Sequence, residues 1–137
     1  MSAAAAFDLQ TAVYGALASD AALLALLGDP PRLHDDTPAG TGFPLVTLGE
    51  VTSLDWSTAT ESGAEHRLTL NAWSRQGGRA QVQAILGALS ARLHLAELSL
   101  ASHRLVLLRL EFAQVLREGD GETWHGIQRY RALTEDI

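Results

Sequence analysis

Residues 64–75 read AEHRLTLNAWSR and contain the clearest strand pattern in the chain. Apolar residues recur there at every second position, at Leu68, Leu70 and Ala72. The positions between and around them hold polar or aromatic residues, namely Arg67, Thr69, Asn71 and Trp73. Because successive side chains of a strand point to opposite faces of a sheet, this alternation predicts a strand with one buried face.

An amphipathic helix is predicted directly after this strand, over residues 79–95. Gly77-Gly78 separates the two elements, and apolar residues then recur three and four positions apart, at Val82, Ile85, Leu86, Leu89 and Leu93. That spacing gives a helix one apolar stripe. A strand, a short turn and a helix therefore form the middle of the chain, and the other segments must cover both elements.

The N-terminal segment, residues 4–27, has a helical pattern with an interruption at Ser19-Asp20. Asp20 is suited to cap a second short helix, because its side chain can accept a hydrogen bond from an N–H group of the first turn. Gly28 and Pro30-Pro31 end the helical segment, since glycine adopts the left-handed cap conformation and proline cannot continue a helix.

Three further strands are predicted on the two sides of this unit. Residues 43–51 alternate as a strand after a loop over residues 29–42, in which residues 32–34 form a short extended piece. Residues 103–117 and 124–133 form an antiparallel hairpin around a turn rich in glycine and acidic residues. The low β-branched content of residues 103–117 leaves a helix open as an alternative for that segment.

The element order α-β-β-α-β-β predicts an α+β domain with a single four-stranded antiparallel sheet and two helices on one face. A length of 137 residues suits one domain. Residues 53–63 are polar apart from Leu54 and Trp56, and they are longer than a tight hairpin turn needs. We therefore interpret them as an arm at the tip of the first hairpin.

The chain is acidic, with a formal net charge of −6 from 16 acidic and 10 basic residues, all of the latter arginine. Because the chain has no cluster of basic residues, it is poorly suited to bind nucleic acid. The absence of cysteine excludes disulfides and thiolate metal ligands. No apolar run reaches the roughly 18 residues of a membrane-spanning helix, and the N-terminus lacks the basic region of a signal peptide. We expect a soluble protein, made in the cytoplasm, with no membrane partner.

His34, Asp35 and Asp36 are the best candidates for a metal site, with His66 as a fourth ligand, because imidazole and carboxylate groups bind divalent ions. Adjacent side chains seldom converge on one ion, so we interpret the first three as a solvated turn. Glu65 beside His66 suggests an acid–base pair, but neighbours on a strand point to opposite faces. We assign no catalytic, cofactor-binding or metal-binding residue.

Trp56 and Trp73 are candidate interface anchors, because aromatic residues are common at the centres of interfaces. Trp56 lies in the predicted arm with Ser57, Thr58 and Glu61, and Trp73 lies on the polar face of the central strand. Packing of either tryptophan within its own subunit stays open as the alternative.

Arg129 and Arg131 fall on one face of the last strand, and Arg109 lies on the strand expected beside it. An arginine row is able to bind phosphate or acidic partners. We favour cross-strand pairing with nearby glutamates, which are Glu111, Glu118 and Glu122. The turn over residues 118–123, with Asp120 and Glu122, is a further candidate contact that we expect to order only on assembly.

Five sequence segments are similar to those of a known family: ALASDAALLALLGD (residues 16–29), FPLVTLGE (43–50), DWST (55–58), EHRLTLNAWSR (65–75) and HGIQRYRALTE (125–135). In their residues and in their order along the chain, these segments resemble the tail-completion family of long-tailed phages and gene transfer agents, which includes tail terminator proteins. Together they extend over most of the chain, and none of them is a catalytic signature.

The resemblance implies a structural role. Six copies would form a ring that caps the tail tube, stops its polymerisation and joins the tail to the head connector. The implied partners are further copies of the chain, the tail tube protein and the head–tail connector protein, with DNA passing through the lumen without specific binding. Assembly would take place in the bacterial cytoplasm. From the net charge we expect an acidic lumen that repels DNA and lets it slide.

Three alternatives stay open. A head–tail joining protein on the head side would share the size and fold of a terminator. A small metal-dependent enzyme would use His34, Asp35 and Asp36, and elemental analysis of the purified protein distinguishes it. A ligand-binding regulatory α+β domain would form a stable dimer with a filled pocket.

Overall fold

A five-stranded mixed sheet in the order β1-β2-β3-β5-β4 forms one layer of the molecule. The computed structural model describes residues 3–36 and 39–137. Its strands are β1 (Leu33–His34), β2 (Leu45–Asp55), β3 (Gly63–Ser74), β4 (His103–Arg117) and β5 (Trp124–Asp136). β1 runs parallel to β2, whereas the other three neighbouring pairs are antiparallel.

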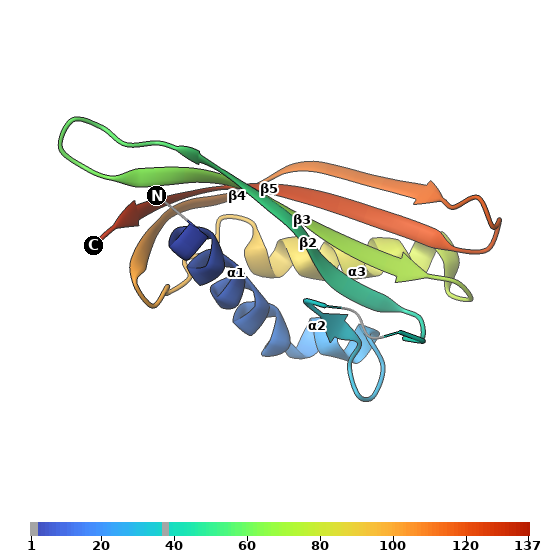
Figure 1. The fold of residues 1–137 in the computed structure, drawn as a ribbon. Coiled ribbons are helices and arrows are strands. Elements are labelled where there is room, and N and C mark those ends of the chain that lie inside the picture. The colour runs from blue at the N-terminus through green and yellow to red at the C-terminus, as the bar shows by residue number, and fades with distance from the viewer. Residues whose placement is uncertain (1–2, 37–38) are drawn as a thin grey trace.

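Three helices, α1 (Ala3–Ala18), α2 (Ala21–Leu26) and α3 (Gly78–Leu93), lie on one side of the twisted sheet (Figure 1). The expected four-stranded antiparallel sheet with two helices is therefore wrong. β1 lies within the short extended piece predicted over residues 32–34, but two residues are too few for the sequence to show that they pair with another strand. β1 pairs with Val46 and Thr47 and lies inside the predicted loop over residues 29–42. Thr37 and Pro38, in the same range, lie outside the described residues.

The central strand β3 has the predicted alternation. Its buried side chains point toward the helices and include His66, Leu68, Leu70, Ala72 and Ser74. The intervening side chains point to the other face, which we call the free face: Glu65, Arg67, Thr69, Asn71 and Trp73. β3 pairs with β2 on one side and with β5 on the other, so its two faces define the two faces of the sheet.

The helix α3 packs on the sheet through the predicted stripe, Val82, Ile85, Leu86, Leu89 and Leu93, all of which are buried. It approaches β5 closely at Gly126. A Cβ atom added there would lie 2.7 Å from Cγ1 of Val82 and 3.0 Å from Cδ1 of Leu86. Glycine at this position therefore lets the helix and the strand come into direct contact.

The N-terminal helical segment breaks where predicted, because Asp20 ends α1 and caps α2 by accepting a hydrogen bond from Ala22 N at 3.1 Å. α1 is also attached to the start of β4 through the buried side chain of Asp8. Its carboxylate accepts hydrogen bonds from Ala101 N at 2.9 Å and Ser102 N at 2.8 Å, and it contacts His103 Nδ1 at 2.9 Å.

Two long hairpins project from opposite ends of the sheet (Figure 1). β2 continues to Asp55, so the arm predicted over residues 53–63 is paired strand at its base and leaves residues 56–62 as the tip. β4 is a strand throughout its 15 residues, so the alternative of a helix over residues 103–117 is excluded. Shifts of its register with β5 occur at Val106 and Glu111.

Candidate interaction surfaces

An ion-pair network crosses the middle of the free face. Arg67 on β3 contacts both carboxylate oxygens of Glu111 on β4, at 3.1 and 3.2 Å. Glu65 accepts a hydrogen bond from Arg131 Nε at 2.6 Å and pairs with Arg67 at 3.1 Å. The Arg131 bond holds the pKa of Glu65 below its ordinary value. The network joins three strands and leaves these carboxylates neutralised.

The predicted arginine row is therefore only partly available for binding phosphate or acidic partners. Arg131 is occupied by Glu65, and the guanidinium of Arg129 stacks over the ring of Phe112 at 4.8 Å. Arg109 is opposite Arg131 in the β4–β5 register and makes no ion pair with any residue in the described ranges. Pairing of these arginines with the three named glutamates is not observed. The glutamates instead contact Arg67, His125 and Arg75.

A hollow of about 700 Å³ lies at the end of the free face near the β4–β5 turn. Trp73 forms part of its wall and stacks on His125 of β5, with ring centroids 3.7 Å apart. His125 contacts Glu118 at 2.9 Å and Asn71 at 2.7 Å. Burial lowers the pKa of His125, and Glu118 partly opposes that effect. Trp73 is thus packed within its own subunit and still borders an open depression.

The β4–β5 turn is held together by Asp120. Its carboxylate accepts hydrogen bonds from Glu122 N, Thr123 N and the Thr123 hydroxyl, at 2.9, 2.8 and 2.6 Å, and these bonds lower its pKa to about 2. Arg75 donates to the Thr123 hydroxyl at 3.0 Å and pairs with Glu122 at 3.4 Å. These contacts hold the turn together within a single chain, and ordering on assembly stays a prediction.

The hairpin tip is closed by its own hydrogen bonds. Trp56 N donates to Gly63 O at 2.9 Å, and Thr58 N donates to Glu61 O at 2.8 Å. The Ser57 hydroxyl bonds Asp55 at 2.6 Å. The indole of Trp56 packs over Gly63, where an added Cβ would lie 3.2 Å from Cε3, yet 40% of the residue stays exposed. Trp56 therefore has an internal contact and an outward face.

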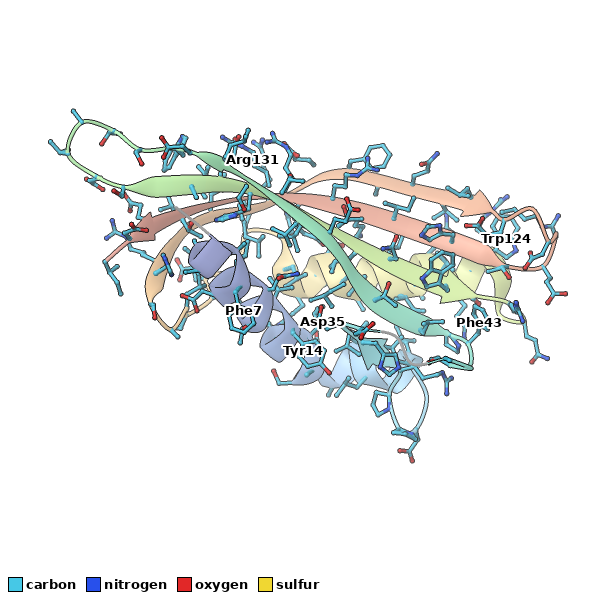
Figure 2. All side chains as sticks on the ribbon, in the orientation of Figure 1. Phe7, Tyr14, Asp35, Phe43, Trp124 and Arg131 are labelled. Atoms are coloured by element: carbon cyan, nitrogen blue, oxygen red, sulfur yellow. The ribbon has the colours of Figure 1, made fainter. Side chains whose placement is uncertain are left out.

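The candidate metal ligands do not gather at one place. His34 lies in β1, and the exposed Asp35 borders a small hollow with Phe7 and Tyr14 of α1 (Figure 2). His66 is fully buried on the helix-covered face. Within residues 3–36 and 39–137, no three histidine or acidic side chains are grouped so that they could hold a metal ion.

His66 belongs to a buried polar cluster that sequence reasoning missed. Its Nδ1 lies 2.7 Å from the Ser53 hydroxyl on β2, and its Nε2 lies 2.9 Å from the Thr134 hydroxyl on β5. Burial lowers the pKa of His66, with a smaller contribution from the charge of His103. Both ring nitrogens are occupied and the ring is inaccessible, so the serine–histidine contact joins strands. Glu65 points to the opposite face, as predicted.

A family model described as "Tail completion protein gp17" matches residues 11–135. Among solved structures, the chain is similar to a chain in the virion of a native gene transfer agent particle. The two are 33% identical, with a TM-score of 0.89 over 98% of this chain and 99% of that one.

A second similar structure is the gp17 protein of bacteriophage SPP1. It is 23% identical, with a TM-score of 0.63, and the alignment covers 98% of this chain and 91% of that one. At this identity the likeness shows a shared fold. No curated protein sequence matched the chain. No helix in the described part of the chain is long and apolar enough to cross a membrane.

Proposed function

The chain belongs to the tail completion protein gp17 family, and from this membership we propose that it is a structural tail terminator of a phage-like particle. It forms a hexameric ring that caps the tail tube, stops tube polymerisation and joins the tail to the head connector. Its partners are further copies of itself, the tail tube protein and the connector protein. Its place is the particle tail, after assembly in the bacterial cytoplasm.

The observation that carries this proposal is the nearly complete match to a chain that is part of a gene transfer agent virion. The alignment leaves out almost nothing of either chain, so the whole domain, and not one shared motif, is common to both. The family model independently covers residues 11–135. A tail completion role follows from the family, and the ring, the cap and the connector contact are our extension of it.

The arrangement of the surfaces supports a structural role in preference to catalysis. The two hairpins reach out from opposite ends of the sheet, which suits contacts with two different partners (Figure 1). The histidines and aspartates that an enzyme would use are separated, and His66 is closed off by its two hydroxyl partners. We therefore assign the exposed hairpins to partner contacts and assign no residue to chemistry.

Electron microscopy of particles from cells that lack this gene tests the proposal. A missing terminator should leave tubes of uncontrolled length and heads without tails. Tails of normal length that fail to join filled heads would instead assign the protein to the head side of the junction. Intact, normal particles would contradict both assignments.

Replacement of Trp56 with alanine is expected to leave the fold intact and to weaken assembly. The indole is the largest side chain of the hairpin tip and is 40% exposed. Aromatic anchors at interfaces commonly contribute 2 kcal/mol or more to binding, so we expect a loss of roughly 30-fold in affinity. The yield of tailed particles measures assembly, and circular dichroism of the purified variant measures folding.

The matched control is Trp56→Phe, which keeps an aromatic face against Gly63 and should assemble nearly as well as the wild type. Normal particle yield with Trp56→Ala would show that the hairpin tip is not an assembly contact. That result would leave the terminator proposal to be decided by the gene deletion.

A further inference from the structure

The outer edge of β2 is unpaired over most of its length. β1 pairs only with Val46 and Thr47. Beyond them, the backbone of residues 48–55 makes no hydrogen bond on the side away from β3 with any described residue. Glu50, Thr52 and Leu54 are exposed in this stretch. An open edge of this kind is a template for another strand.

The outer edge of β4 is divided into a covered half and an open half. Leu95 N donates to Leu108 O at 2.7 Å, and Leu110 N donates to His94 Nδ1 at 3.1 Å. Leu95 does this with a φ of 60°, a left-handed conformation that is costly for leucine. From residue 111 to residue 117 no described segment covers the edge. The fold thus closes one half of β4 at a conformational cost and leaves the other half available.

We propose that these two open edges pair with each other between neighbouring copies, residues 48–55 of one copy against residues 111–117 of the next. The inference rests on the proposed ring. A cyclic operation keeps every strand pointing the same way along the ring axis. Since β2, β3, β5 and β4 alternate in direction, the β4 of one copy meets the β2 of the next antiparallel, and the sheet continues without a break.

The two edges have nearly equal length and matching faces. Opposite residues of an antiparallel pair share one face. In the register that places Leu54 opposite Phe112, both of these exposed side chains lie on the free face. Thr52 then lies opposite Gln114 on the same face. On the helix-covered face, the same register brings together two partly buried valines, Val51 and Val115.

The charges of the two edges are complementary. β2 carries Glu50 and Asp55 and no basic residue along its whole length. The open half of β4 contains Glu111, but that carboxylate is already bound by Arg67. Three arginines surround this half of the strand: Arg79 and Arg117 over the ring of Trp124, and Arg129 over Phe112. In the proposed register Asp55 lies opposite Glu111, whose charge is neutralised by Arg67, and Glu50 lies opposite Leu116, next to Arg117. Pairing of β2 with β4 is therefore favoured over pairing of two acidic β2 edges.

A depression beside the open half of β4 suits the incoming strand. Residues 113–115 and the α3 residues Arg79, Gln83 and Leu86 line a hollow of about 510 Å³. In the proposed register, Ser53 and Val51 of the neighbour project toward this side of the sheet. The contact would then consist of backbone hydrogen bonds along the edge and side chains in the hollow, which is how strand addition combines affinity with specificity.

Continuing the sheet also sets which face lines the lumen. With about 4.8 Å between strands, four strands in each of about six copies give a perimeter of roughly 115 Å. Helices inside such a barrel would fill it, so the free face lines the lumen. The strands carry five arginines and three glutamates on that face: Arg67, Arg104, Arg109, Arg129, Arg131, Glu65, Glu111 and Glu135. Arg75, Glu118 and Asp120 border the hollow at the end of the same face. In the proposed ring the lumen therefore has nearly balanced charges, in place of the acidic lumen expected from the net charge.

A cysteine pair tests the register directly, because the chain has no cysteine of its own. Thr52→Cys and Gln114→Cys are combined in one chain, and particles are purified from cells in which this variant is the only copy. Opposite residues place their Cβ atoms about 5 Å apart, within reach of a disulfide after mild oxidation. We expect a ladder of multiples of the 14.6 kDa chain on a denaturing gel.

Each single cysteine variant should give no ladder, and neither should Thr52→Cys combined with Ala91→Cys on the outer surface of α3. A visible ring without crosslinks would overturn the edge pairing and leave the terminator proposal standing. A ladder that ends at the dimer would also overturn it, as would a crosslink to a different protein. Particles that contain no copy of the chain would contradict the terminator proposal itself.

Hydrogen exchange of the wild-type chain provides a second test that needs no variant. Amides within residues 48–55 and 111–117 should exchange at least 10-fold more slowly in assembled tails than in the purified single chain. Amides of α3 on the side away from the sheet should be unchanged. Equal exchange at both edges in the two samples would overturn the proposal.

Discussion

Replacement of Leu70 with alanine is expected to lower the free energy of unfolding by about 2–5 kcal/mol. Leu70 is fully buried in the middle of β3, opposite Leu48 of β2 and Gln128 of β5. Truncation removes apolar contacts and leaves a cavity between the sheet and the helices. Domains of this size have only about 5–15 kcal/mol of total stability, so the loss is a large fraction of it.

The neighbouring residue provides the control. Thr69 lies on the free face, one position before Leu70, and is only partly buried. Thr69→Ala should cost less than about 1 kcal/mol, because surface substitutions rarely change stability by more. Urea unfolding followed by circular dichroism measures both variants. Similar losses for the two would contradict the two-faced arrangement of the sheet on which all the surface assignments depend.

Replacement of Asp8 with asparagine is expected to lower the free energy of unfolding at pH 7 by about 1–3 kcal/mol. The ionised carboxylate accepts two backbone hydrogen bonds and contacts His103, and asparagine offers only one acceptor oxygen. At least one of the two N–H groups, of Ala101 or Ser102, would lose its hydrogen-bond partner. The start of β4 would then separate more easily from α1. Asp36→Asn, at an exposed position, is the matched control and should have little effect.

The stabilisation by the Asp8 carboxylate should also depend on pH. Burial raises the pKa of Asp8, but the bonds from His103, Ser102 and Ala101 outweigh that effect and hold the pKa below the ordinary value of 3.8. The unfolded chain therefore binds a proton at a higher pH than the folded chain does. The stabilisation is present above pH 3.8 and is lost as the pH falls through the folded-state pKa.

Unfolding of the wild type and of Asp8→Asn should consequently be compared between pH 7 and pH 2.5. We expect the difference in the free energy of unfolding between the two proteins to be constant down to about pH 4 and to shrink below it. Protonation of Asp8 weakens in the wild type the same carboxylate hydrogen bonds that the substitution has already weakened in the variant. A difference that stays constant over the whole range would show that the Asp8 carboxylate is not specifically stabilised in the folded chain.

Family membership was accessible from the sequence through segments spread along the chain, and no single residue identified it. The phrase at residues 65–75, for example, combines the alternating strand with the tryptophan beside the hollow. Those phrases led to the tail-completion family, which the comparisons confirm. The candidate contact residues were less accessible. Trp56 and Asp120 were named from their position in polar turns, but only the tertiary structure shows the hydrogen bonds that close both turns within one chain.

The distribution of charge over the two faces of the sheet was also not accessible from the sequence. The composition is acidic, yet five of the arginines gather on the free face because strand alternation and register select them from three different strands. A net charge describes the whole surface and has no information about which face receives which residues. This grouping of arginines became visible only when β3, β4 and β5 were placed side by side.

The sequence by itself determined the elements that depend on neighbours in the chain. Alternation marked β3, the three-and-four spacing marked α3, and Asp20 marked the break between α1 and α2. The tertiary structure alone decided the contacts between residues far apart in the chain, such as the parallel pairing of β1, the attachment of Asp8 to residues 101–103, and the open edges of β2 and β4. The physical reason is that periodicity and capping are local properties of the backbone, whereas which strand lies beside which is selected by the packing of the whole domain.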